Sequence, residues 1–170
     1  MKQTASILIA ILFLFASCGK DSKNEWSRFY GFTQADIVGH YESNPDESLY
    51  EELPTAGITV YDNVTIDIGA VGSTAVSLHI VIPGKINKTF SGTINTNDDH
   101  HSDLVLNNGN NEDVMMTVYK NEDGRVRFHG RVKHYYYNAD NELVNSINWG
   151  FDVVKEDASF VGSILRMQMN

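Results

Sequence analysis

From Ile58 onward, apolar and polar residues tend to alternate with a period of two. The positions between the apolar residues are mostly filled by Thr, Ser, Asn, Asp, Arg or Lys. This period is typical of β-strands that have one face in a core and the other in solvent. The expected inward sets are Val64, Ile66 and Ile68; Val76, Leu78, Ile80 and Ile82; Ile86, Phe90 and Ile94; Val114, Met116 and Val118; Val126, Phe128, Val132 and Tyr136; and Leu143, Ile147, Trp149, Phe151 and Val153.

Short segments rich in Asn, Asp and Gly separate the alternating runs. They are 107–113 (NNGNNED), 121–124 (NEDG) and 138–141 (NADN). These residue types tolerate positive φ angles or hydrogen-bond to their own backbone, so the segments predict hairpin turns. One short N-terminal helical turn is expected, where Thr33 can cap the helix and Gly39 can end it.

The pattern therefore predicts an all-β domain, an antiparallel meander of about eight to nine strands. A meander of this size closes into a barrel or folds into a sandwich, because open sheet edges invite aggregation. We expect a barrel, with a β-sandwich as the alternative. No internal repeat or second domain is visible, and we assign residues 30–170 to a single all-β domain.

The first 17 residues have the layout of a secretory signal. Lys2 precedes an unbroken apolar run at 7–16, and this run of about ten residues matches the h-region of a signal peptide. A permanent membrane span would need roughly twenty residues. The sequence FASC, which ends at Cys18, resembles the lipobox of bacterial lipoproteins.

This resemblance implies that residues 1–17 are a signal peptide, that Cys18 is the lipid attachment site and that 18–29 form a flexible tether. A thioether-linked lipid needs a thiol, and two or more acyl chains anchor a protein stably. Gly19 stands where Asp would retain a lipoprotein of enteric bacteria at the inner membrane. By resemblance we expect an outer-membrane protein that faces the periplasm or the cell surface. An ordinary signal peptide followed by an unmodified cysteine is the alternative.

The negative charge of the chain argues against nucleic acid as a partner. The chain has 13 Lys and Arg against 22 Asp and Glu, and removal of residues 1–17 would take away only Lys2 among them. So acidic a protein is a poor match for nucleic acid, whose backbone requires clustered Lys and Arg. Because Cys18 is the only cysteine, the domain has no disulfide and depends on packing.

The stretch 33–43 is similar to the beginning of a lipocalin or calycin barrel. In that family a short helical turn leads into a first strand with a Gly-x-Trp motif, and here Gly39-His40-Tyr41 has Tyr in place of Trp. The resemblance implies that the aromatic ring of Tyr41 closes the barrel floor. It also implies that a basic residue on the last strand packs over this ring, and Arg166 is the candidate.

Two binding hypotheses follow. In the first, the barrel interior binds a small apolar ligand through Phe128, Trp149 and Phe151, although a small barrel can also be filled by its own side chains. In the second, the outer strand face contacts an envelope protein or a polysaccharide, or it is simply a solvated face paired with carboxylates. The outer face carries Arg125, Arg127, Arg131 and Lys133 beside Tyr135 and Tyr137, and we predict Arg127, Arg131, Tyr135 and Tyr137 as the contact.

Catalysis and metal binding have no positive support in the sequence. The loop 97–103 (NDDHHSD) is rich in possible ligands but lacks the spacing of a zinc or calcium motif. No nucleophile elbow, His-Glu-x-x-His or phosphate loop is present. We therefore expect a non-enzymatic protein without a cofactor, and a secreted inhibitor on the same barrel is a third, weaker possibility.

Overall fold

The structure, a computed structural model, describes residues 25–43, 48–50, 57–94 and 102–156. The signal segment with Cys18, most of the 97–103 loop and Arg166 lie outside these ranges. Within the described part, no helix has the length and apolar character that crossing a bilayer requires.

The domain is all-β, as predicted. One short helix, α2 (Gln34–Ile37), accompanies ten strands. The strands are β1 (Ser27–Arg28), β2 (Gly39–Ser43), β3 (Thr59–Val60), β4 (Thr65–Val71), β5 (Ala75–Ile82), β6 (Ile86–Thr93), β7 (Asp103–Asn107), β8 (Glu112–Lys120), β9 (Val126–Tyr137) and β10 (Leu143–Lys155).

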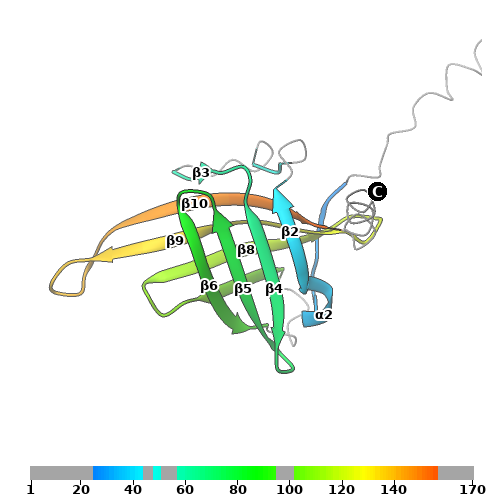
Figure 1. Cartoon of the computed structure of the whole chain (residues 1–170), viewed down its shortest axis with the longest axis horizontal. Helices are drawn as coiled ribbons and strands as arrows, with labels where there is room; N and C mark the ends of the chain where they lie inside the picture. The colour runs from blue at the N-terminus through cyan, green and yellow to red at the C-terminus, as the bar shows by residue number, and fades with distance from the viewer. Residues whose placement is uncertain (1–24, 44–47, 51–56, 95–101, 157–170) are drawn as a thin grey trace, which may run out of the picture.

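Eight of these strands close an antiparallel barrel (Figure 1). Each strand from β4 to β10 pairs with the next along the chain, and β2 completes the ring by pairing with both β4 and β10. The prediction of a barrel rather than a sandwich is confirmed. Two short strands lie outside the ring: β1 pairs antiparallel with β8, and β3 pairs parallel with β10.

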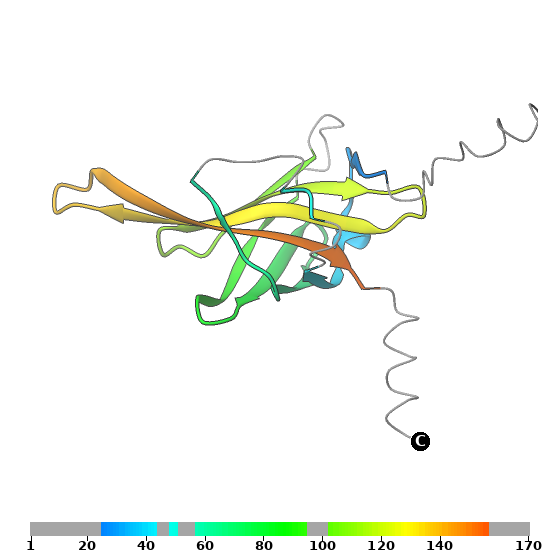
Figure 2. The same cartoon turned by 90° about the horizontal axis from the view of Figure 1, so that it is seen from above.

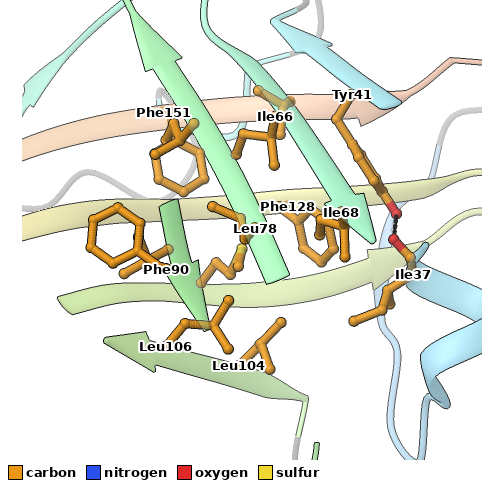
Figure 3. Packing of buried hydrophobic residues seen from close by; sticks show 14 of the residues in the cluster. Ile37, Tyr41, Ile66, Ile68, Leu78, Phe90, Leu104, Leu106, Phe128 and Phe151 are labelled. Carbon is orange, nitrogen blue, oxygen red and sulfur yellow. Dashed lines mark hydrogen bonds between the residues drawn. The ribbon is translucent and has the colours of Figure 1, made fainter. Parts of the chain in front are cut away.

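The predicted alternation fills the barrel interior. Figure 3 shows Leu78, Phe90, Phe128 and Phe151 pointing from different strands toward one another. The inward residues of β4, β5, β6 and β8 are each at most 5% exposed, so these strands follow the prediction. Burial of this apolar surface is the main stabilising contribution to such a fold.

One end of the barrel is closed by α2. Thr33 Oγ1 and its backbone N–H both donate to Asp36 Oδ2, at 2.6 and 2.8 Å, which fixes the first turn of the helix. Ile37 is fully buried and its carbonyl accepts a hydrogen bond of 2.7 Å from Tyr41 Oη (Figure 3). The Tyr41 ring lies 4.6 Å from the ring of Phe128. Tyr41 therefore closes the barrel floor, as the Gly-x-aromatic motif implied.

The basic residue that lies at this floor is Lys155. Lys155 is opposite Tyr41 in the pairing of β10 with β2, and its Nζ donates to the carbonyl of Asp36 at 2.8 Å. Its side chain also passes close to Gly39, where an added Cβ would lie 2.7 Å from Lys155 Cε. Lys155 thus lies at the register position opposite Tyr41, whereas Arg166, for which the contact was predicted, lies outside the described residues.

The described residues begin inside the region expected to be a tether. Ser27 and Arg28 form β1, which pairs with β8. The Arg127 guanidinium lies over the Trp26 ring, with Cζ 4.9 Å from the centre of the ring. Because these residues are held by β8 and β9, the part of the tether that the structure describes lies against the barrel from Trp26 onward.

The β9–β10 hairpin extends beyond the barrel (Figures 1 and 2). β8 begins at Glu112, opposite His134, whereas β9 and β10 continue to pair beyond this point, as far as Tyr137 and Leu143. Tyr136, Leu143 and Ile147 are 40%, 55% and 40% exposed, so their prediction as core residues was wrong. Ile147 keeps the alternation, but in the described structure β8 does not extend far enough to cover this part of the hairpin. Leu143 pairs with Tyr137 after a register shift, which places it on the other face of the hairpin.

Candidate functional site

The barrel interior is filled where we predicted a ligand. Phe128 and Phe151 are both fully buried within one continuous apolar cluster, and Trp149 packs at its margin. All three side chains are inward, as expected from the alternation. Side-chain filling is one of the two ways in which the interior of an eight-stranded barrel is occupied.

A polar cluster lies at the barrel end away from α2. Glu112 is 4% exposed and accepts hydrogen bonds from Lys88, Asn108 and His134. Burial alone would raise the pKa of Glu112, but these donors outweigh it, and the net pKa is lowered. The ionised carboxylate is therefore well paired, and it ties β6, β8 and β9 together at this rim.

A segment that we call the strap, residues 48–50 and 57–61, crosses the outer face of β9 and β10. The backbone N–H of Leu49 donates to Asp152 Oδ2 at 2.7 Å, a contact between residues 103 positions apart. Further along, β3 pairs with β10. The strap thus covers a sheet face that the alternation pattern assigns to solvent.

Gly150 allows the strap to approach the sheet closely. A Cβ at this position would lie 2.5 Å from Ile58 Cγ2 and 2.8 Å from Tyr50 Oη. Tyr50 donates a hydrogen bond to the carbonyl of Gly130, and its ring lies 4.1 Å from that of His129. Burial raises the pKa of Tyr50 well above its ordinary value, so the hydroxyl keeps its proton and remains a donor.

The strap changes the role predicted for Arg127. Arg127 is 1% exposed, and its Nε donates to Asp152 Oδ1 at 2.6 Å. Asp152 is itself 4% exposed and also lies 3.2 Å from His129 Nδ1. The expectation that Arg127 is part of an open contact surface was therefore wrong, because the strap and Trp26 cover this part of the face.

The outer face next to the strap carries a polar row across four strands. Asp103, Thr117, His129 and Asp152 occupy consecutive register positions on β7, β8, β9 and β10. Thr117 Oγ1 donates to Asp103 Oδ1 at 2.6 Å, and His129 faces Asp152 at the other end. The next row toward the hairpin is Val105, Met115, Arg131 and Gly150.

The β7, β8 and β9 members of these two rows line a groove of about 450 Å³. Tyr50 and Ile58 of the strap line it as well, and His129 and Arg131 contribute its basic groups. Arg131 Nε is buried and has no hydrogen-bond partner among the residues that the structure describes. The volume falls within the range of small-molecule sites.

A line of side chains continues from the groove along β9 toward the tip of the hairpin. We call Arg131, Lys133, Tyr135 and Tyr137 the β9 strip. Lys133 Nζ lies 4.7 Å from the centre of the Tyr135 ring, and the rings of Tyr135 and Tyr137 are 6.5 Å apart. Burial and a hydrogen bond to Asp113 raise the pKa of Tyr135. Cations and aromatic rings thus follow one another along the strip, with Tyr137 43% exposed.

Sequence reasoning found the β9 residues but missed their partners. Asp152 was assigned to a solvated face, and Tyr50, Thr117 and Asp103 were not identified as neighbours of His129. Only the register of β7 to β10 and the path of the strap bring them together. Comparisons of the chain with protein-family models, curated proteins and solved structures found no match.

Proposed function

We propose that this protein is a lipid-anchored cell-envelope protein that contacts a macromolecular partner through the β9 strip. The observation that carries the proposal is the position of the strip on a hairpin that extends beyond the barrel. Tyr137, Leu143 and Val144 are 43%, 55% and 61% exposed there. Exposed aromatic and apolar residues next to cations are a composition enriched at binding surfaces.

A small apolar ligand inside the barrel is the competing function. The inward position of Phe128, Trp149 and Phe151 agrees with it, but Phe128 and Phe151 have no exposed surface. A ligand would have to displace core side chains that already make favourable contacts. The outer surface needs no such rearrangement, and for this reason we favour it.

The anchoring part of the proposal depends on Cys18 and the lipobox-like sequence before it. Metabolic labelling with a palmitate analogue should mark the wild-type protein, and the substitution Cys18→Ala should remove the label. Label that persists in the Cys18→Ala protein would contradict lipid attachment at this residue.

The contact is tested by partner capture from detergent-solubilised envelopes of the producing cells. The variant R131M/Y135A/Y137A should lose at least about tenfold in captured partner, because truncation of aromatic and Arg anchors removes most of the binding energy at an interface. The matched control K85M/V71A changes an exposed cation and an exposed apolar residue elsewhere on the barrel. Equal capture by wild type and the β9 variant would reject this surface.

A further inference from the structure

We propose that the groove beside the strap is a binding subsite for an acidic sugar residue, so that the partner is a uronate-type polysaccharide. The inference rests on the proposed function, because it names the class of partner that the β9 strip would contact. The groove combines a guanidinium, hydrogen-bond acceptors and apolar surface.

Arg131 supplies the cation for a sugar carboxylate. Its Nε is buried without a hydrogen-bond partner among the described residues, although the side chain lines the groove. A guanidinium presents a planar set of donors that matches a carboxylate in geometry. A carboxylate bound here would provide the acceptor that Nε lacks.

The opposite side of the groove supplies acceptors for sugar hydroxyls. The exposed carboxylate of Asp103 already accepts from Thr117 Oγ1 and has capacity for further donors. His129 directs Nδ1 toward Asp152 at 3.2 Å, which leaves Nε2 as the second ring nitrogen. In the neutral imidazole that donates through Nδ1, Nε2 is an acceptor.

Apolar surface lies between these polar groups. The Tyr50 ring forms part of one wall, and Val105 and Met115 belong to the floor, with Val105 54% exposed. A sugar ring has both hydroxyls and a C–H face, and it could use the acceptors and the apolar surface together. The ionised side chains of an acidic peptide would gain from Arg131 but carry no hydroxyls that could donate to Asp103 and His129.

The β9 strip gives a polymer a path out of the groove. Lys133, Tyr135 and Tyr137 follow Arg131 on the same strand face, and the two tyrosine rings are 6.5 Å apart. A chain held at the groove could therefore place later residues against these rings and its charge near Lys133. The acidic protein would then bind an acidic polymer through a local basic surface, and we expect the affinity to fall as salt increases.

The test is calorimetric titration of the lipid-anchored protein in detergent micelles. The probes are polygalacturonate, neutral dextran and poly-glutamate. We expect polygalacturonate to bind at least about tenfold more tightly than either of the others. R131M and D103N should each weaken this binding by about tenfold, as loss of charged hydrogen bonds does. The controls K85M and D123N make the same charge changes at exposed positions in turns away from the groove.

A third variant, V105W, fills the groove without a change in charge and should also abolish binding. Thermal unfolding of each variant checks that the barrel remains folded. Binding of polygalacturonate that R131M, D103N and V105W leave unchanged would overturn the inference, as would no binding at all. Equal binding of poly-glutamate would overturn it in favour of an acidic protein partner. In each of these cases, loss of partner capture in R131M/Y135A/Y137A would still support the contact through the β9 strip.

Discussion

At the scale of single residues, Asp152 holds together parts of the chain that are far apart in sequence. Its carboxylate accepts from the Arg127 guanidinium and from the Leu49 backbone, and it lies beside His129. Both members of the Arg127–Asp152 pair are almost completely buried. Ion pairs of this kind are costly to break, because the remaining charge has no water to replace its partner.

The substitution Asp152→Ala should therefore lower the free energy of unfolding by about 3–5 kcal/mol, measured by chemical denaturation. The control is Asp67→Asn, which removes an exposed carboxylate that is paired with His40. That change should lower stability by less than about 1 kcal/mol. Similar effects of the two substitutions would mean that Arg127 finds water or another partner when Asp152 is absent.

The lowered pKa of Glu112 predicts that the stability of the protein depends on pH. Its pKa in the folded protein is lowered from the ordinary value of 4.5, since its hydrogen-bond donors outweigh the effect of burial. A carboxyl group with a lowered pKa stabilises the fold when the pH is above the ordinary pKa of that group. This contribution disappears as the pH falls through the folded-state pKa. Glu112→Gln should lower stability by about 1–3 kcal/mol at pH 7.

The difference between wild type and Glu112→Gln should then shrink as the pH is lowered below 4.5. Denaturant titrations at a series of pH values measure it. A difference that stays constant from pH 7 to pH 3 would show that the loss of stability comes from packing rather than from the paired charge.

At the scale of elements, the strap depends on the absence of a side chain at Gly150. Gly150→Ala would place a Cβ within 2.5 Å of Ile58 and 2.8 Å of the Tyr50 hydroxyl. We expect the strap to move away from the sheet, with a loss of about 1–3 kcal/mol, which is typical of overpacking. Limited proteolysis should then cut the strap faster.

Gly69→Ala is the matched control for Gly150→Ala, because an added Cβ at Gly69 meets nothing within 4 Å. Gly69 also lies in a strand and has no positive φ angle. We expect its substitution to leave stability and proteolysis unchanged or slightly improved. If both substitutions behave alike, the strap is not held by close contact at Gly150.

The hairpin should contribute little to the stability of the barrel. Leu143 and Val144 are more than half exposed, and in the described structure the strand pairing of this region is within the hairpin itself. The double substitution L143S/V144S should change the free energy of unfolding by less than about 0.5 kcal/mol. A large loss of stability would mean that these residues are covered in the folded protein.

At the scale of the whole molecule, local alternation was enough to predict the barrel. Ile66, Leu78 and Phe90 are inward because a strand exposes alternate faces, and this rule needs no knowledge of distant residues. The helical turn at Thr33 could also be predicted from its local capping residues, whereas the floor position of Tyr41 was implied only by the resemblance of the Gly-x-aromatic motif.

The rest of the site could not be predicted, because it depends on contacts between distant segments. Arg127 and Asp152 fit a solvated strand face, and only the strap turns that face into a buried one. The opposite error occurs at Ile147, where the alternation continues after the barrel has ended, and at Leu143, where a register shift moves the residue to the other face. Periodicity assigns residues to a face of a strand, whereas the path of the chain decides whether that face is covered.

We propose that the outer surface of β9, and not the barrel interior, contacts the partner. The most direct measurement places a photo-crosslinking amino acid at Tyr137, or at the similarly exposed Val71 of β4, in the lipid-anchored protein on intact cells. We predict a defined crosslinked product from position 137 and none from position 71. Equal products from both positions, or a product from position 71 alone, would contradict the claim.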